Sequence, residues 1–115
     1  MRINEYRSLD EFTSQYVGEW SPSDGHYYGL EFRYRGKDYR LHTWQMHADD
    51  PEFTPDGREV LFGLYEINIK AQGNMQFVLM ASFPSMEELL VYTGIDNRPF
   101  SEIIMADSTQ ILGQD

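Results

Sequence analysis

A predicted β-hairpin over residues 29–44 constrains the fold of this chain more than any other stretch. Apolar and charged residues alternate along it, which is the period-2 pattern of a strand with one buried face. Gly36-Lys37 lies at its centre and suits a two-residue turn, because glycine is favoured at the first turn position. A turn there pairs six residues on one inward face: Tyr34 with Tyr39, Phe32 with Leu41 and Leu30 with Thr43.

The other face of this hairpin carries a candidate polar site. The same register puts Glu31 opposite His42 and Arg33 opposite Arg40. Directly opposed like charges are unfavourable, so the two arginines need a carboxylate or a bound anion nearby. Three interpretations stay open. One is a solvated surface that neighbouring carboxylates neutralise. Another is a ligand-binding site of Glu31, Arg33, Arg40, His42 and Trp44, in which His42 beside a carboxylate could act as a general base. The third is a nucleic-acid platform, since aromatic and basic residues interleave here, although the net charge of the molecule repels phosphate.

A second hairpin is predicted from strands over residues 60–70 and 75–83. A three-residue loop at 72–74, with Asn74 in the left-handed conformation, pairs apolar residues with apolar residues. A two-residue turn at Gly73-Asn74 is the alternative, and it shifts the register by one. With the three-residue loop, the predicted core of the sheet has four members on one face: Phe32, Leu41, Ile67 and Leu79.

Two capping-box patterns predict helices. Ser8 and Ser85 are each followed by Glu three positions later and then by apolar residues at helical spacing. The helices are expected over residues 9–17 and 85–93, since a glycine follows each of these stretches.

The C-terminal pattern is weaker, although Pro99 can begin a short helical turn and residues 109–112 read as a final strand. Together these elements predict an α+β fold in a single globular domain, residues 1–115. We expect a mainly antiparallel sheet of about four to five strands, built from two β-hairpins, with two helices packed on one face.

The charge distribution favours a basic protein partner. The net charge is −10, and residues 49–115 hold three Lys and Arg against twelve Asp and Glu. Phosphate contacts need cationic side chains, so direct binding to nucleic acid or to an anionic membrane is disfavoured. The acidic irregular stretch at 49–59 is the expected docking segment, with Asp49, Asp50, Glu52, Phe53 and Asp56 as its partner-binding residues. Three apolar residues are candidate anchors for the partner: Met46, Phe53 and Phe100.

Motifs for chemistry are missing from the sequence. The chain has no cysteine, which excludes a disulfide, a thiolate zinc site and a cysteine nucleophile. No glycine-rich phosphate loop occurs. A calcium loop aligned on Gly57 of the acidic stretch at 49–59 would need a glutamate at residue 63, but this residue is Gly63. We therefore expect no metal and no cofactor. The first residues lack the apolar run of a signal peptide, and the longest apolar run has five residues, so we expect a cytoplasmic protein without a membrane span.

Two functional hypotheses remain. The first is a non-enzymatic acidic binding or accessory protein that engages a protein partner, and a homodimer stays open. The second is a small enzyme or ligand-binding domain that uses the polar face of the hairpin at 29–44. The first predicts an exposed patch, and the second predicts a concave site at the hairpin.

Overall fold

A computed structural model describes residues 8–16, 29–43, 53–69 and 73–114 of the chain. These ranges form three short helices and five strands. In chain order they are α1 (Leu9–Gln15), β1 (Gly29–Tyr34), β2 (Lys37–Thr43), β3 (Phe62–Ile69), β4 (Met75–Phe83), α2 (Met86–Leu90), α3 (Phe100–Met105) and β5 (Gln110–Gln114). The strands form one antiparallel sheet in the order β4-β3-β2-β1-β5. The predicted α+β class is confirmed.

The serine caps start α1 and α2 where the sequence predicts. The Ser8 hydroxyl accepts a hydrogen bond from the backbone N–H of Glu11 at 3.2 Å, and Ser85 accepts one from Glu88 at the same distance. Both serines have extended backbones, as an N-cap residue requires. Both helices end earlier than predicted, at Gln15 and at Leu90.

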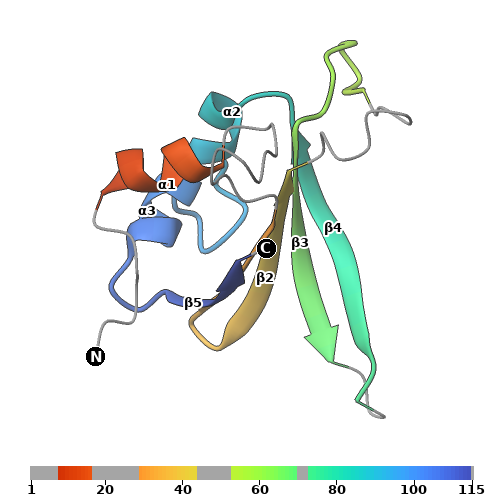
Figure 1. Ribbon diagram of the computed structural model, residues 1–115. Helices are drawn as coiled ribbons and strands as arrows, with labels where there is room; N and C mark the ends of the chain where they lie inside the picture. Colours follow the sequence, from red (N-terminus) through yellow and green to blue (C-terminus); the bar gives the residue numbers. More distant parts are fainter. Residues whose placement is uncertain (1–7, 17–28, 44–52, 70–72, 115) are drawn as a thin grey trace.

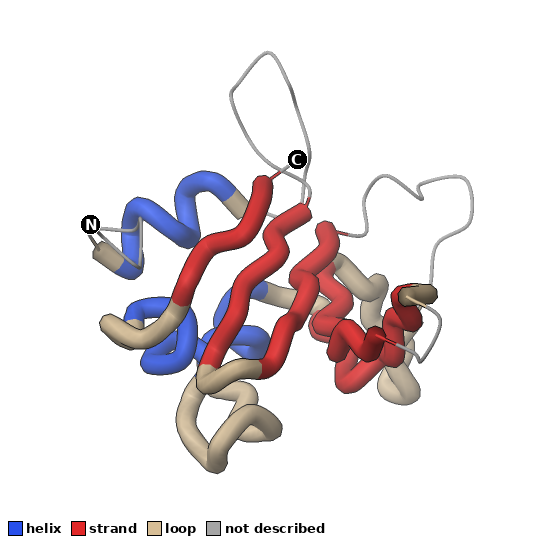
Figure 2. The backbone as a smooth tube through the Cα atoms, turned by 90° about the horizontal axis from the view of Figure 1, so that it is seen from below, coloured by secondary structure: helices blue, strands red, loops and turns tan. Residues whose placement is uncertain are grey.

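The three helices cover one face of the sheet, as Figures 1 and 2 show from two directions. Aromatic rings pack between the helix layer and the sheet. Phe100 of α3 lies 6.0 Å from the ring of Phe12 in α1 and 5.9 Å from the ring of Phe32 in β1. All three are fully or almost fully buried, and each such side chain stabilises the fold by about 1.5–3 kcal/mol. The core therefore lies between the helices and the sheet.

The β1–β2 turn lies one residue earlier than predicted. Arg35 and Gly36 form it, with φ of 51° and 79°, so that Tyr34 pairs with Lys37. Positive φ at both turn positions is the type I′ geometry that matches the twist of a hairpin. The predicted Gly36-Lys37 turn is wrong, and each β1 residue pairs with a β2 residue two positions earlier than predicted. A shift of two keeps every side chain on its predicted face.

The β3–β4 hairpin also pairs differently from the prediction. β4 has the predicted bounds, but Ile67 pairs with Phe77 rather than with Leu79. Gly73, not Asn74, has the left-handed conformation, with φ of 79°. Residue 72 of the predicted loop lies outside the described residues.

A β-bulge reverses the alternation along β4. Leu64 pairs with Ala81 but Tyr65 pairs with Leu79, so Met80 is the extra residue. Ala81 therefore points toward the helices, while Leu79 points away from them.

The predicted four-residue core is correct for Phe32 and Leu41, which are fully buried on the helix side. It is wrong for Ile67 and Leu79, because the register places both on the opposite face. Ile67 is buried there, whereas Leu79 is 47% exposed.

Candidate functional site

The sheet face that points away from the helices, here called the outer face, is half charged and half apolar. Directly paired residues of neighbouring strands point to the same side, so the register assigns its members. β1 and β2 provide the charged half, and β3 and β4 provide the apolar half. The described members include Glu31, Arg33, Asp38, Arg40 and His42 in the charged half, and Tyr65, Ile67, Met75, Phe77 and Leu79 in the apolar half.

Two ion pairs order the charged half. The Arg33 guanidinium donates to both carboxylate oxygens of Asp38, at 2.6 and 3.1 Å, and this contact raises the pKa of Arg33. Arg40 donates to Glu31 at 3.2 Å. The predicted opposition of Arg33 and Arg40 is wrong, because the earlier turn places each arginine opposite a carboxylate. The arginines of the predicted ligand site therefore have anionic partners within the chain.

His42 is not opposite Glu31, as predicted, but opposite Gly29. Its Nε2 atom is shielded from solvent, and the Glu31 carboxylate is bound by Arg40. Trp44, the remaining residue of the predicted ligand site, lies outside the described residues. The structure thus brings four of the five predicted residues to one face, and the role of these residues in binding stays a prediction.

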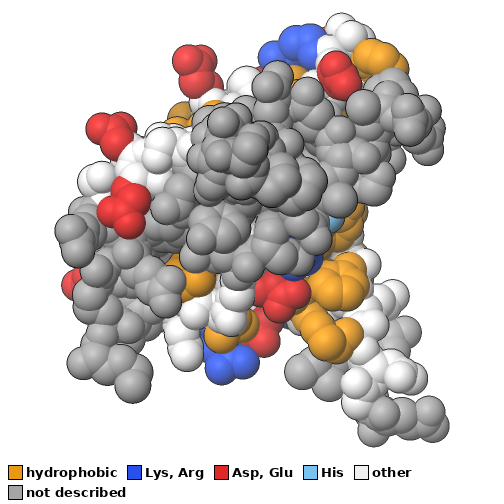
Figure 3. Space-filling model, in the orientation of Figure 1, with side chains coloured by type: hydrophobic (Ala, Val, Ile, Leu, Met, Phe, Trp, Pro, Cys, Tyr) orange, Lys and Arg blue, Asp and Glu red, His pale blue; other side chains and the backbone are white. Residues whose placement is uncertain are grey.

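The apolar half is the feature that the sequence prediction missed. Met75, Phe77 and Leu79 are 53%, 47% and 47% exposed, although they sit at regular positions of a strand. Figure 3 shows hydrophobic side chains gathered over the β3–β4 hairpin, beside charged ones. The sequence signal was present, since residues 75–83 contain no charged residue. Apolar side chains at half exposure in the middle of a regular strand are a surface that a binding partner could cover.

The predicted docking segment is described only from residue 53 onward. Asp49, Asp50, Glu52 and the candidate anchor Met46 lie outside the described residues. Phe53 forms a bridge with Glu59 and is 62% exposed, as a docking residue must be. Phe100 is wrong as an anchor, because it is buried in the core beneath α3.

Arg58 ties this segment to α2. Its guanidinium donates to Asp56 at 2.8 Å and to both carboxylate oxygens of Glu88 at 2.9 Å. Asp56 also accepts a hydrogen bond from the Thr54 hydroxyl, which is the main reason that its pKa is lowered; Arg58 adds to the effect. One arginine therefore partly neutralises two carboxylates, that of Asp56, a predicted partner-binding residue, and that of Glu88.

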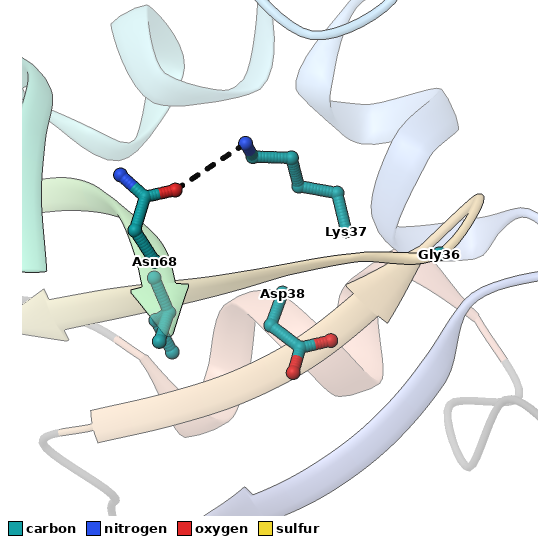
Figure 4. A pocket seen from close by; sticks show the side chains of 5 residues that line it. Gly36, Lys37, Asp38 and Asn68 are labelled. Atoms are coloured by element: carbon teal, nitrogen blue, oxygen red, sulfur yellow. Dashed lines mark hydrogen bonds between the residues drawn. The ribbon is translucent and has the colours of Figure 1, made fainter. Parts of the chain in front are cut away.

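A hollow of about 200 Å³ opens beside the β1–β2 turn (Figure 4). In Figure 4, Lys37 and Asn68 point to one side of the strands and Asp38 to the other. The Lys37 ammonium contacts Glu66 and lies 3.5 Å from the Asn68 side-chain oxygen. None of the residues predicted to bind a ligand lines this hollow. Its lining consists of Gly36, Lys37, Asp38, Ile67 and Asn68.

Neither a metal cluster nor a membrane-spanning helix is found in the part of the chain that the structure describes. No three His, Asp or Glu side chains come together there to hold an ion. No helix in these ranges has the length and apolar character to cross a bilayer. Comparisons with protein-family models, with curated proteins and with solved structures found no match to this chain.

Proposed function

We propose that this protein is a non-enzymatic binding protein that engages a basic protein partner through the apolar half of its outer face. The observation that carries the proposal is the exposure of Phe77 and Leu79 in the middle of β4. Pairing with β3 already orders the backbone of this segment, so binding costs little further backbone freedom when a partner covers both side chains. Aromatic and aliphatic anchors of this kind contribute much of the affinity of protein interfaces.

The net charge supports the choice of a basic partner. At −10, the chain creates a negative potential that attracts a cationic protein from a distance. Such steering raises the association rate more than the affinity, and salt weakens it because the screening length is about 10 Å at 0.1 M. Charge would then govern the encounter, and the apolar half would hold the complex together.

The alternative, a small enzyme or ligand-binding domain, has less support. It needs a concave site at the β1–β2 hairpin, and the hollow that the described residues form there is lined by none of Glu31, Arg33, Arg40 and His42, the four expected members that the structure describes. The charged half of the outer face also has its arginines paired with Asp38 and Glu31.

The test compares two truncations. Wild-type protein captures a partner from source lysate, and the partner is purified. Its dissociation constant is then measured by calorimetry against wild type, Leu79→Ala and the matched control Val91→Ala. Val91 is 68% exposed and is the C-cap residue of α2, which lies on the side of the sheet opposite to the outer face. An anchor worth about 2 kcal/mol predicts roughly 30-fold weaker binding for Leu79→Ala and no change for Val91→Ala.

Stopped-flow kinetics on the same pair test the role of charge. The association rate should fall steeply between low and physiological salt. If Leu79→Ala and Val91→Ala bind the partner equally well, the apolar half is not part of the interface. A salt-independent association rate would contradict the proposal that the partner is basic. Turnover of a small molecule by the pure protein would contradict the proposal of a non-enzymatic function.

A further inference from the structure

The two edges of the sheet differ in how they are protected. β5, at one edge, has five residues, contains Gly113 and pairs with β1 through a register shift. β4, at the other edge, has nine residues without a charge, a proline or a glycine. Soluble proteins normally protect an edge with charges, proline or bulges, because its unpaired N–H and C=O groups can bind another strand. Only part of β4 has such protection.

The bulge at Met80 divides β4 into two parts. Residues 75–79 pair regularly with β3, and all five are exposed. From Met80 onward the residues are partly or fully buried. The unprotected edge is therefore a regular five-residue segment, and Phe77 is its midpoint.

We propose that two copies of this chain pair through this segment, antiparallel and centred on Phe77, to form one continuous ten-stranded sheet. A two-fold axis through Phe77 places this residue opposite its own copy. It also places Met75 opposite Leu79 and Gln76 opposite Val78 of the second copy. Every outer-face pair is then apolar, and no charges are opposed. An antiparallel strand pair has this two-fold symmetry by construction, so the segment is complementary to itself.

The surface area that this segment can bury limits the affinity of such a dimer. On the outer face Met75, Phe77 and Leu79 are 47–53% exposed, which amounts to roughly 300 Å² of patch per copy. Edge-to-edge pairing covers the strand edges and the flanks of these side chains but leaves their outer surfaces exposed, so two copies bury well under roughly 700 Å² of side-chain surface. Stable interfaces bury about 1,200–2,000 Å². The dimer is therefore weak and reversible, and it forms as the protein concentration rises.

The dimer is independent of the proposed function. The two-fold axis stands perpendicular to the sheet, so both apolar halves face the same side and form one longer surface. Salt separates the two proposals. Each copy carries −10, so salt strengthens self-association by screening repulsion, whereas it weakens the encounter with a basic partner.

Sedimentation velocity over a concentration series tests the dimer on the pure full-length chain. Wild type should shift from monomer to dimer, and the shift should move to lower concentration at higher salt. Phe77→Lys and Phe77→Glu should each be monomeric, because each puts like charges directly opposite one another. An equal mixture of the two variants should regain the dimer, because Lys then faces Glu. Val91→Lys is the matched control and should behave as wild type.

A check of folding and a replacement variant keep the result decisive. Circular dichroism checks that the Phe77 variants are folded. If they are not, Gln76→Lys replaces them, since it adds an edge charge at an exposed polar position. A wild type that stays monomeric to about 1 mM overturns the proposal. So do folded variants that still dimerise, and so does a mixture of the Phe77 variants that stays monomeric.

Discussion

The two faces of the sheet predict very different costs for two truncations, Phe32→Ala and Leu79→Ala. Phe32 is fully buried, and its ring contacts those of Tyr39 and Phe100 at centroid distances of 5.4 and 5.9 Å. Truncating a buried Phe costs about 3–5 kcal/mol, because the lost transfer free energy adds to that of the cavity. Leu79 is about half exposed, so only about half of the 1.5–3 kcal/mol for a fully buried leucine is at stake. We expect a loss of about 1 kcal/mol for Leu79→Ala.

Urea denaturation followed by circular dichroism measures both losses as changes in the free energy of unfolding. The protein concentration is kept low, so that self-association does not add to the stability of wild type. Similar slopes of free energy against urea concentration would show that the comparison is between the same two states. A cost for Leu79→Ala equal to that for Phe32→Ala would mean that the assignment of the two faces is reversed. A Phe32→Ala cost near 1 kcal/mol would mean that no cavity forms beneath the helices.

Two other predictions concern local geometry. Gly94→Ala should cost about 1–3 kcal/mol in the same assay, because the new Cβ would overlap the hydroxyl and the ring of Tyr92; a silent substitution would show that this ring can move aside. Asp56 has a lowered pKa in the folded state, through Thr54 first and Arg58 second, so the stability it contributes is present above its unfolded pKa and is lost as the pH falls through the lower, folded one. Thermal melts between pH 6 and pH 2 should therefore show a smaller acid-induced drop in Tm for Asp56→Asn than for wild type, and identical drops would contradict this role.

The sequence predicted the first hairpin's faces but not its partners, and the reason is local. Gly36 fits the first position of one two-residue turn and the second position of another. Only the second option requires Arg35 to adopt a positive φ, which is uncommon for a residue with a side chain. The two registers differ by an even number of residues, so both bury Leu30 and Phe32. The two registers differ in which charged residues are paired, and in the observed register Arg33 and Arg40 are each opposite a carboxylate instead of opposite each other.

The pattern did not predict the pairing of the second hairpin, because β4 has apolar residues on both of its faces. Phe77, Val78 and Leu79 are consecutive, so alternation cannot tell which of them face the helices. The bulge at Met80 then exchanges the faces partway along β4, and no residue type in the sequence marks it. The candidate site lies on the side that this bulge exposes. The capped helix starts, by contrast, depend on contacts within four residues, so Ser8 and Ser85 were predictable.

The position of β5 has a consequence for how the chain folds during its synthesis. β1 to β4 are neighbours in the sheet in the same order as in the sequence, but β5 pairs with β1, far behind it in the chain. At about 5–20 residues per second, a ribosome needs roughly 4–15 s between completing β1 and reaching β5. Among the described strands, β5 is the one that pairs with the β1 edge around Phe32, so from the pairing of β1 with β2 until β5 is made this edge lacks that partner. Slower translation between residues 34 and 110 would lengthen this exposure, while faster translation would bring β5 to its place sooner.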